Sequence, residues 1–123
     1  MNRSAAPAAI AGLGALFLLG FGLWAFLDAR SFFEQLAPFE PFNAHFLHDI
    51  GAFQIGIGAT LALALWRRGD ALLAALGGAG IGSAFHAVAH VMDGHLGGRE
   101  SDPIVFGVMT VVLLAGAAAQ LRR

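Results

Sequence analysis

The sequence predicts an all-α integral membrane protein, a four-helix bundle built as a single domain over residues 1–123. Hydrophobic residues make up 58% of the chain and charged residues only 12%, whereas average globular proteins carry about 25% charged residues. Four long runs also contain no Asp, Glu, Lys or Arg: residues 4–27, 50–66, 71–92 and 103–121. Each run is long and apolar enough to form most of a transmembrane helix, so four helices are expected.

The length that a bilayer requires places each span. A hydrocarbon core of about 30 Å needs roughly 17 to 25 helical residues, so we expect spans near residues 7–27, 44–66, 71–92 and 103–121. The second run is short, so its helix must begin near His45 and include Asp49 in its first turns. The first run exceeds the roughly 7 to 15 apolar residues of a signal peptide, so we expect it to be retained as a span.

The basic residues predict the orientation. Five of the seven would lie on one side of the membrane: Arg3, Arg67, Arg68, Arg122 and Arg123. Only Arg30 and Arg99 lie in the other two loops. The positive-inside rule then places both termini, N and C, in the cytoplasm. No basic stripe marks a nucleic-acid surface, so no nucleic acid is expected. The expected partner is the lipid bilayer, with a homo-oligomer or a larger membrane complex left open.

The loops carry signals for helix starts. A Ser-x-x-Glu capping box beginning at Ser31 predicts a short helix in the first loop, with Phe32 and Phe33 pressed onto the membrane surface. Asn43 is a suitable N-cap for the second span, because its side chain can accept a hydrogen bond from a free backbone N–H. Pro103 can start the fourth span, since proline is favoured in the first helical turn.

Small residues predict which helices touch. The turn at residues 67–70 is so short that spans two and three must be antiparallel neighbours. Both spans carry small residues at helical spacing: Ala52, Gly56 and Ala59 on the second, and Ala75, Ala79 and Gly82 on the third. Helices in lipid associate through close packing of small residues. We therefore expect spans two and three to pack along these two stripes.

Two pairs of polar residues interrupt the apolar spans: His45 with Asp49, and His86 with His90. Residues four apart share a helix face, and ionisable groups within a membrane usually line a functional site. In antiparallel neighbours all four side chains would meet near the extracytoplasmic end. The chain has no cysteine, and imidazole and carboxylate donors suit zinc, iron, manganese or copper. The sequence therefore predicts a transition-metal site with these four residues as ligands.

Other polar residues lie close to this predicted site. Asn43 and Asp93 would hydrogen-bond to a ligand imidazole and orient it. His48 lies off the face of Asp49, and His95 lies in a glycine-rich loop, so both are expected at the surface. These residue types do not specify a reaction, and the question of enzymatic activity stays open.

Residues 41–52 read P-F-N-x-H-x-x-x-D-I-G-A. This motif resembles the pattern P-F/Y-N-x-H-x3-D-I/V-G-A of small uncharacterised four-helix bacterial membrane proteins, of actinobacterial type and more loosely DoxX-like. In those proteins a later helix carries His-x-x-x-His followed by further His or Asp, as His86, His90 and Asp93 do here. The likeness spans roughly residues 30–95. It implies a four-helix architecture in the bacterial inner (plasma) membrane and no particular function. His48 departs from the pattern, which more often has a basic residue there.

Three other interpretations stay open. In the first, haem b is held axially by His45 or His86 and an opposing His90, and the protein transfers electrons. In the second, the protein is a non-catalytic scaffold or accessory subunit, and His–Asp hydrogen bonds only clamp its helices together. In the third, the histidines relay protons or serve transport in an oligomer, because histidine changes charge near neutral pH.

Overall fold

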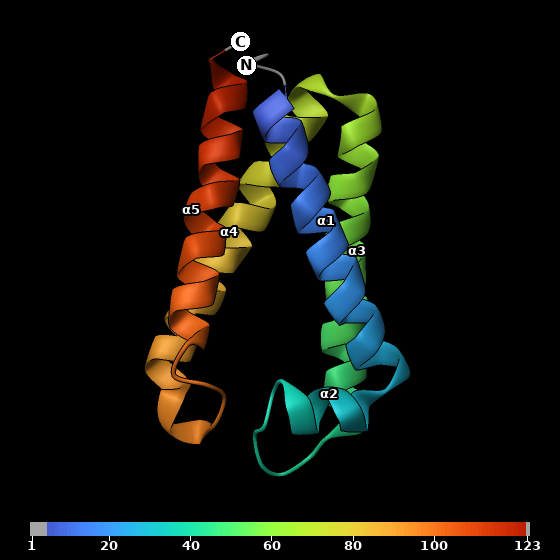
Figure 1. The fold of residues 1–123 in the computed structure, drawn as a ribbon, viewed down its shortest axis with the longest axis vertical. Helices are drawn as coiled ribbons and strands as arrows, with labels where there is room; N and C mark the ends of the chain where they lie inside the picture. Colours follow the sequence, from blue (N-terminus) through green and yellow to red (C-terminus); the bar gives the residue numbers. More distant parts are fainter. Residues whose placement is uncertain (1–4, 123) are drawn as a thin grey trace.

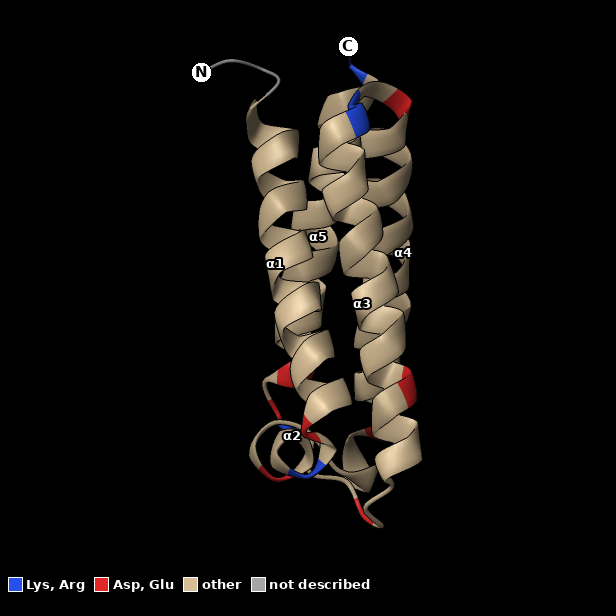
Figure 2. Cartoon of the chain, turned by 90° about the vertical axis from the view of Figure 1, so that its right-hand side faces the viewer, with Lys and Arg blue, Asp and Glu red and all other residues tan. Residues whose placement is uncertain are grey.

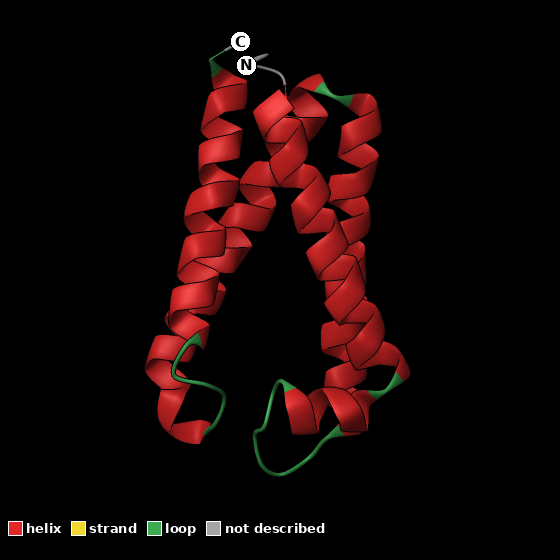
Figure 3. Cartoon of the chain, in the orientation of Figure 1, coloured by secondary structure: helices red, strands yellow, loops and turns green. Residues whose placement is uncertain are grey.

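The structure is a computed structural model that describes residues 5–122, and these residues form an all-α fold (Figures 1 and 3). The elements are α1 (Ala5–Leu27), α2 (Ala29–Gln35), α3 (Ala44–Arg67), α4 (Gly69–Asp93), the 3-10 turn η1 (Gly94–Leu96) and α5 (Asp102–Leu121). The long helices α1, α3, α4 and α5 are each long and apolar enough to cross a membrane. The prediction of an all-α chain with four such helices is confirmed.

The helix ends follow the local signals in the sequence. Asn43 caps α3, with its Oδ1 accepting a hydrogen bond from the backbone N–H of Phe46 at 3.1 Å. Pro103 lies in the first turn of α5, where its missing N–H leaves no intrahelical bond unmade. The turn between α3 and α4 is shorter than expected, because Arg68 alone separates the two helices. Arg68 has φ 59° and Gly69 has φ 52°, so the chain reverses within two residues.

The four long helices pack as two pairs, α1 with α3 and α4 with α5 (Figure 1). We call the end where α1 begins and α5 finishes the terminal end, and the end that carries α2 and η1 the loop end. The expectation that α3 and α4 pack along their small-residue stripes is wrong. A Cβ atom at Gly56 or Gly82 would meet nothing within 4 Å, so these glycines border open space. α3 and α4 are antiparallel and joined by the tight turn, but each packs mainly against another helix.

The α1–α3 interface depends on a different set of glycines. A Cβ atom on Gly51 would lie 2.7 Å from the carbonyl oxygen of Gly22 and 2.8 Å from the backbone nitrogen of Phe26. A Cβ atom on Gly58 would lie 2.9 Å from Cγ of Leu19. The two backbones therefore come closest at Gly22 and Gly51, where neither residue has a side chain, and Gly58 makes room for the Leu19 side chain. Such close approach at small residues favours helix association in lipid.

The fold has two hydrophobic cores, which lie at different positions along the length of the helices. The core nearer the terminal end is shared by all four long helices: Ala11, Ala15, Leu18, Leu61, Ala64, Leu72, Ala75, Leu76, Leu113 and Ala117. The core at the loop end contains residues of α1, α2 and α3 only: Ala25, Ala29, Phe32, Phe33 and Leu47. The two helix pairs are therefore packed together near the terminal end and spread apart toward the loop end (Figure 1).

The short helix α2 differs from the expected surface helix. Its N-cap is Asp28, whose Oδ1 accepts a hydrogen bond from the backbone N–H of Ser31 at 3.1 Å, so Ser31 does not start the helix. The Ser31 hydroxyl instead accepts a hydrogen bond from the Trp24 indole Nε1–H at 3.2 Å. Phe32 and Phe33 are buried in the loop-end core rather than spread on a membrane surface. Burial of two large aromatic rings stabilises α2 more than partial exposure would.

The two helix pairs also meet through their loops. Phe39 and Gly97 form an isolated antiparallel bridge, and the backbone N–H of Gly98 donates to the Pro38 carbonyl oxygen at 3.1 Å. The Arg99 guanidinium donates to the carbonyl oxygen of Gln35 at the end of α2. We call these contacts the loop bridge. They connect the loop that follows α2 with the loop that precedes α5, across the wide end of the fold (Figure 3).

Candidate functional site

His86 and His90 lie on one face of α4 near the loop end, as their four-residue spacing predicts. Their two Nε2 atoms face each other at 3.1 Å. The ring centroids are 4.9 Å apart and the ring planes differ by 29°, so the imidazoles are stacked. The two imidazoles therefore hold their Nε2 nitrogen atoms side by side.

Two residues of α5 complete the surroundings of this pair. Asp102 Oδ2 lies 3.7 Å from Nδ1 of His90 and accepts a hydrogen bond from the backbone N–H of Arg99 at 2.8 Å. The Phe106 ring stacks on both imidazoles, with centroids 3.8 Å from His86 and 5.1 Å from His90. A carboxylate therefore lies on one side of His90, and His86 lies on the other.

The loop before α5 closes over the His90–Asp102 contact. Gly98 has φ +85°, a conformation that side chains other than glycine rarely adopt. A Cβ atom at this position would lie 3.1 Å from Oδ2 of Asp102 and 3.6 Å from Nδ1 of His90. The side chains of His90 and Asp102 are accordingly only 25% and 19% exposed. Gly98 also takes part in the loop bridge, so the same loop segment contacts both the other helix pair and the His90–Asp102 pair.

The other predicted ligands lie on the other helix pair. His45 Nε2 is 3.6 Å from Asp49 Oδ2, and both side chains are largely exposed on α3. The predicted convergence of this pair with His86 and His90 depended on α3 packing along α4. Because α4 packs on α5 instead, the structure brings His86 and His90 together with Asp102. Within residues 5–122, no three His, Asp or Glu side chains are grouped closely enough to hold a metal ion.

The remaining polar residues have local roles or lie exposed. Asn43 is the N-cap of α3. Asp93 is the last residue of α4 and is exposed. The His48 ring lies 5.5 Å from the ring of Phe26 and so faces α1. His95 lies exposed in η1, as its place in a glycine-rich segment predicts.

Sequence reasoning missed Asp102 and Phe106. The available signal was the Asp-Pro pair at residues 102 and 103, which marks a helix start and places an acidic group at the end of the fourth span. Phe106 follows Asp102 by four residues, so both lie on the same face of α5. A glycine-rich loop that turns back toward α4 brings that face onto the histidine pair. No protein-family model, curated protein or solved structure matches the chain, so the resemblance to the DoxX-like membrane proteins stays a prediction.

Proposed function

We propose that the chain is a multi-pass membrane protein that binds one transition-metal ion through His86 and His90 at the loop end. The observation that carries the proposal is the 3.1 Å separation of the two Nε2 atoms. With metal–nitrogen bonds of about 2.0–2.1 Å, adjacent ligands lie about 2.9 Å apart in octahedral and about 3.3 Å apart in tetrahedral coordination. The histidine pair thus has the spacing of two neighbouring metal ligands, and without a metal ion the same distance fits an N–H···N hydrogen bond between the two rings.

The position of Asp102 supports the same proposal, because it lies beside the ring nitrogen of His90 that does not face His86. Histidines that bind metals almost always donate their second ring N–H to a carboxylate, a carbonyl oxygen or water. Asp102 Oδ2 is 3.7 Å from Nδ1 of His90, the ring nitrogen that would not bind the metal. Two imidazole donors suit zinc, copper or iron better than manganese, which prefers oxygen ligands. The other coordination positions are left for water, a substrate or a residue from a second copy in a homo-oligomer.

The geometry favours a metal ion over haem b. Axial haem ligands lie on opposite faces of the porphyrin, with the iron between them. His86 and His90 instead project from one face of one helix with their rings stacked. His45, the other axial candidate, lies on α3 in the other helix pair.

A structural role for the same residues has its own observation in its favour. The Phe106 ring stacks on both imidazoles, and Asp102 contacts His90, so these four side chains connect α4 to α5. This is a narrower form of the His–Asp clamp, acting between α4 and α5 rather than between α3 and α4. A scaffold or accessory subunit would need the clamp and no metal.

Metal analysis of detergent-purified protein after growth with added zinc tests the proposal. We expect one metal ion per chain, or one per two chains if a second copy completes the site. His86→Ala should lose at least nine-tenths of the metal, because one of two protein ligands is removed. His45→Ala should retain it, since His45 lies on another helix pair. Metal retention by His86→Ala would contradict the proposal. Metal-free wild-type protein that His90→Ala destabilises would favour the clamp.

We further propose that the loop end is extracytoplasmic and that both termini face the cytoplasm of a bacterial inner membrane. Arg67, Arg68 and Arg122 lie at the terminal end, while acidic residues gather mainly at the loop end (Figure 2). The positive-inside rule supports this orientation. The chain lacks cysteine, so His95→Cys introduces a single thiol at the loop end. We expect a membrane-impermeant maleimide to label that thiol in intact cells. Labelling only after lysis would reverse the orientation.

A further inference from the structure

The loop bridge reaches the candidate metal site through two consecutive residues, Gly98 and Arg99. The backbone N–H of Gly98 donates to the Pro38 carbonyl oxygen at 3.1 Å. The Arg99 guanidinium donates to the carbonyl oxygen of Gln35. The backbone N–H of Arg99 donates in the other direction, to Asp102 Oδ2 at 2.8 Å. This two-residue segment therefore contacts the α1–α3 pair on one side and the candidate site on the other.

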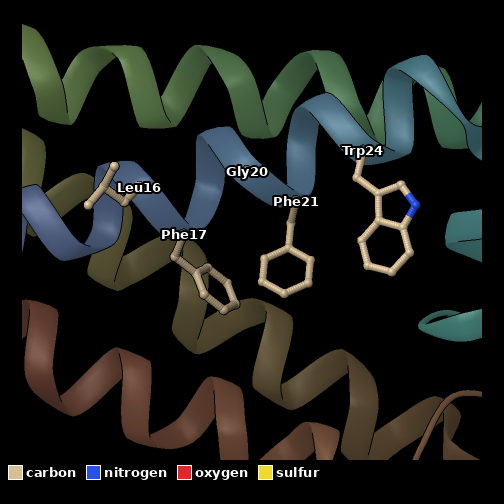
Figure 4. A pocket seen from close by; sticks show the side chains of 5 residues that line it. All are labelled: Leu16, Phe17, Gly20, Phe21 and Trp24. Carbon is tan, nitrogen blue, oxygen red and sulfur yellow. The ribbon is translucent and has the colours of Figure 1, made fainter.

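The part of the α1–α3 pair that Arg99 contacts is itself held by hydrogen bonds. Gln35 is the last residue of α2, where carbonyl oxygens lack intrahelical partners and basic side chains commonly bind them. The Gln35 side chain donates from Nε2 to Ser31 Oγ at 2.9 Å. The same hydroxyl accepts the indole N–H of Trp24, whose side chain projects from α1 (Figure 4). Arg99 therefore connects the candidate site to a fixed junction of α1 and α2.

Few other contacts join the two helix pairs at the loop end. Within residues 5–122, every hydrogen bond between the pairs belongs to the loop bridge. The loop-end core is formed by α1, α2, α3 and the loop that follows α2, so its burial holds only one of the two pairs together. Segments held by a few exposed hydrogen bonds open at low free-energy cost. The distance between the pairs at this end therefore depends on one loop.

We propose that the loop bridge is a latch that closes when a metal ion binds to His86 and His90, with Asp102 and Arg99 as the coupling residues. This inference rests on the metal site proposed above. A neutral imidazole carries hydrogen on one nitrogen only, so a metal ion on Nε2 of His90 leaves the hydrogen on Nδ1, facing Asp102 Oδ2. The two atoms are 3.7 Å apart, which exceeds the roughly 3.2 Å limit of an N–H···O hydrogen bond. The contact therefore tightens when the metal ion binds.

The tightened contact fixes the loop segment. Asp102 then accepts two hydrogen bonds, one from the His90 ring and one from the Arg99 backbone, so its carboxylate holds the segment in the conformation that reaches Gln35. A segment that is already ordered loses less conformational entropy when the bridge forms, and metal binding therefore favours the closed latch. The coupling is reciprocal, so a change that opens the latch weakens metal binding by the same factor.

Arg99→Ala tests the coupling, with Arg30→Ala as the matched control. Both substitutions remove one arginine from the loop end, but Arg30 contacts Glu34 and the Phe42 ring within its own helix pair. The affinity of the purified full-length protein for zinc is measured by competition with a chelator. We expect Arg99→Ala to weaken zinc binding at least about fivefold and Arg30→Ala not to weaken it. Loss of a positive charge would by itself strengthen the binding of a cation, so a weaker affinity reports the latch.

The distance between the helix pairs gives a second measurement, made with the bridge intact. Leu27 at the end of α1 and His95 in η1 are both exposed, so cysteines at these positions carry nitroxide labels on the two pairs. We expect saturating zinc to narrow the distribution of distances between the labels, and Arg99→Ala to reduce this narrowing. Equal zinc affinity of the wild-type and Arg99→Ala proteins, or a distribution that bound zinc leaves unchanged, would overturn the latch and leave the metal site standing. A wild-type protein that binds no zinc would remove the metal site and the latch with it.

Discussion

Replacing Gly51 with leucine is expected to lower the free energy of unfolding by about 3 kcal/mol, the upper part of the range for overpacked cores. A Cβ atom on Gly51 would approach the Gly22 carbonyl oxygen and the Phe26 backbone nitrogen to 2.7 and 2.8 Å. Both are backbone atoms, so they cannot move aside as a flexible side chain can. The α1 and α3 helices must separate, which removes packing along the whole interface. Titration with SDS measures the change, with unfolding followed by the fluorescence of Trp24 in proteins that also carry Trp66→Phe, since the chain has two tryptophans.

Gly56→Leu is the matched control for this prediction. It makes the same chemical change on the same helix, but a Cβ atom at Gly56 would meet nothing within 4 Å. We expect this substitution to be neutral or slightly stabilising, because leucine is a better helix former than glycine, by somewhat less than the about 0.8–1.0 kcal/mol that separates alanine from glycine. Equal losses of stability in both variants would mean that the α1–α3 contact does not hold the fold together.

The helices could be predicted from the sequence, and the reason is local. Each span is defined by a charge-free run and by residues that mark helix ends, such as Asn43 and Pro103. These residues affect only the few residues next to them in the chain. Helix pairing is a different problem, since it depends on complementary surfaces far apart in the chain. Gly51 packs closely because Gly22 lies opposite it, whereas Gly56 has no such counterpart. A stripe of small residues on one helix therefore does not identify its partner.

The candidate site was predicted in part for the same reason. The four-residue spacing of His86 and His90 is a property of α4 alone, and the structure places their Nε2 atoms together. Which acidic residue lies beside the two histidines depends on how the helices pair. His45 and Asp49 were expected beside it, but Asp102 takes that place because α4 packs on α5. Asp102 is a single acidic residue at a helix start, where a helix-capping role is the ordinary interpretation.

If His86 and His90 bind zinc as proposed, Asp102→Asn is expected to weaken that binding by about 10- to 100-fold, which corresponds to about 1.4 to 2.7 kcal/mol. The asparagine side chain keeps an oxygen that can accept the hydrogen bond from the Arg99 backbone N–H. It loses the negative charge beside Nδ1 of His90, a charge that would make the imidazole a stronger ligand at the proposed metal site. Competition with a chromophoric chelator at constant pH measures the dissociation constant for zinc.

Asp49→Asn is the control that separates this role from a general loss of charge. Asp49 also lies beside a histidine, His45, at 3.6 Å, but on the exposed surface of α3. We expect its zinc affinity to equal that of the wild-type protein, because neither residue adjoins the His86–His90 pair. If Asp102→Asn lowers the thermal stability but leaves the zinc affinity unchanged, Asp102 connects α4 to α5 without orienting a metal ligand. If both substitutions weaken zinc binding equally, the two helix pairs close in the membrane far enough for all four predicted ligands to share one ion.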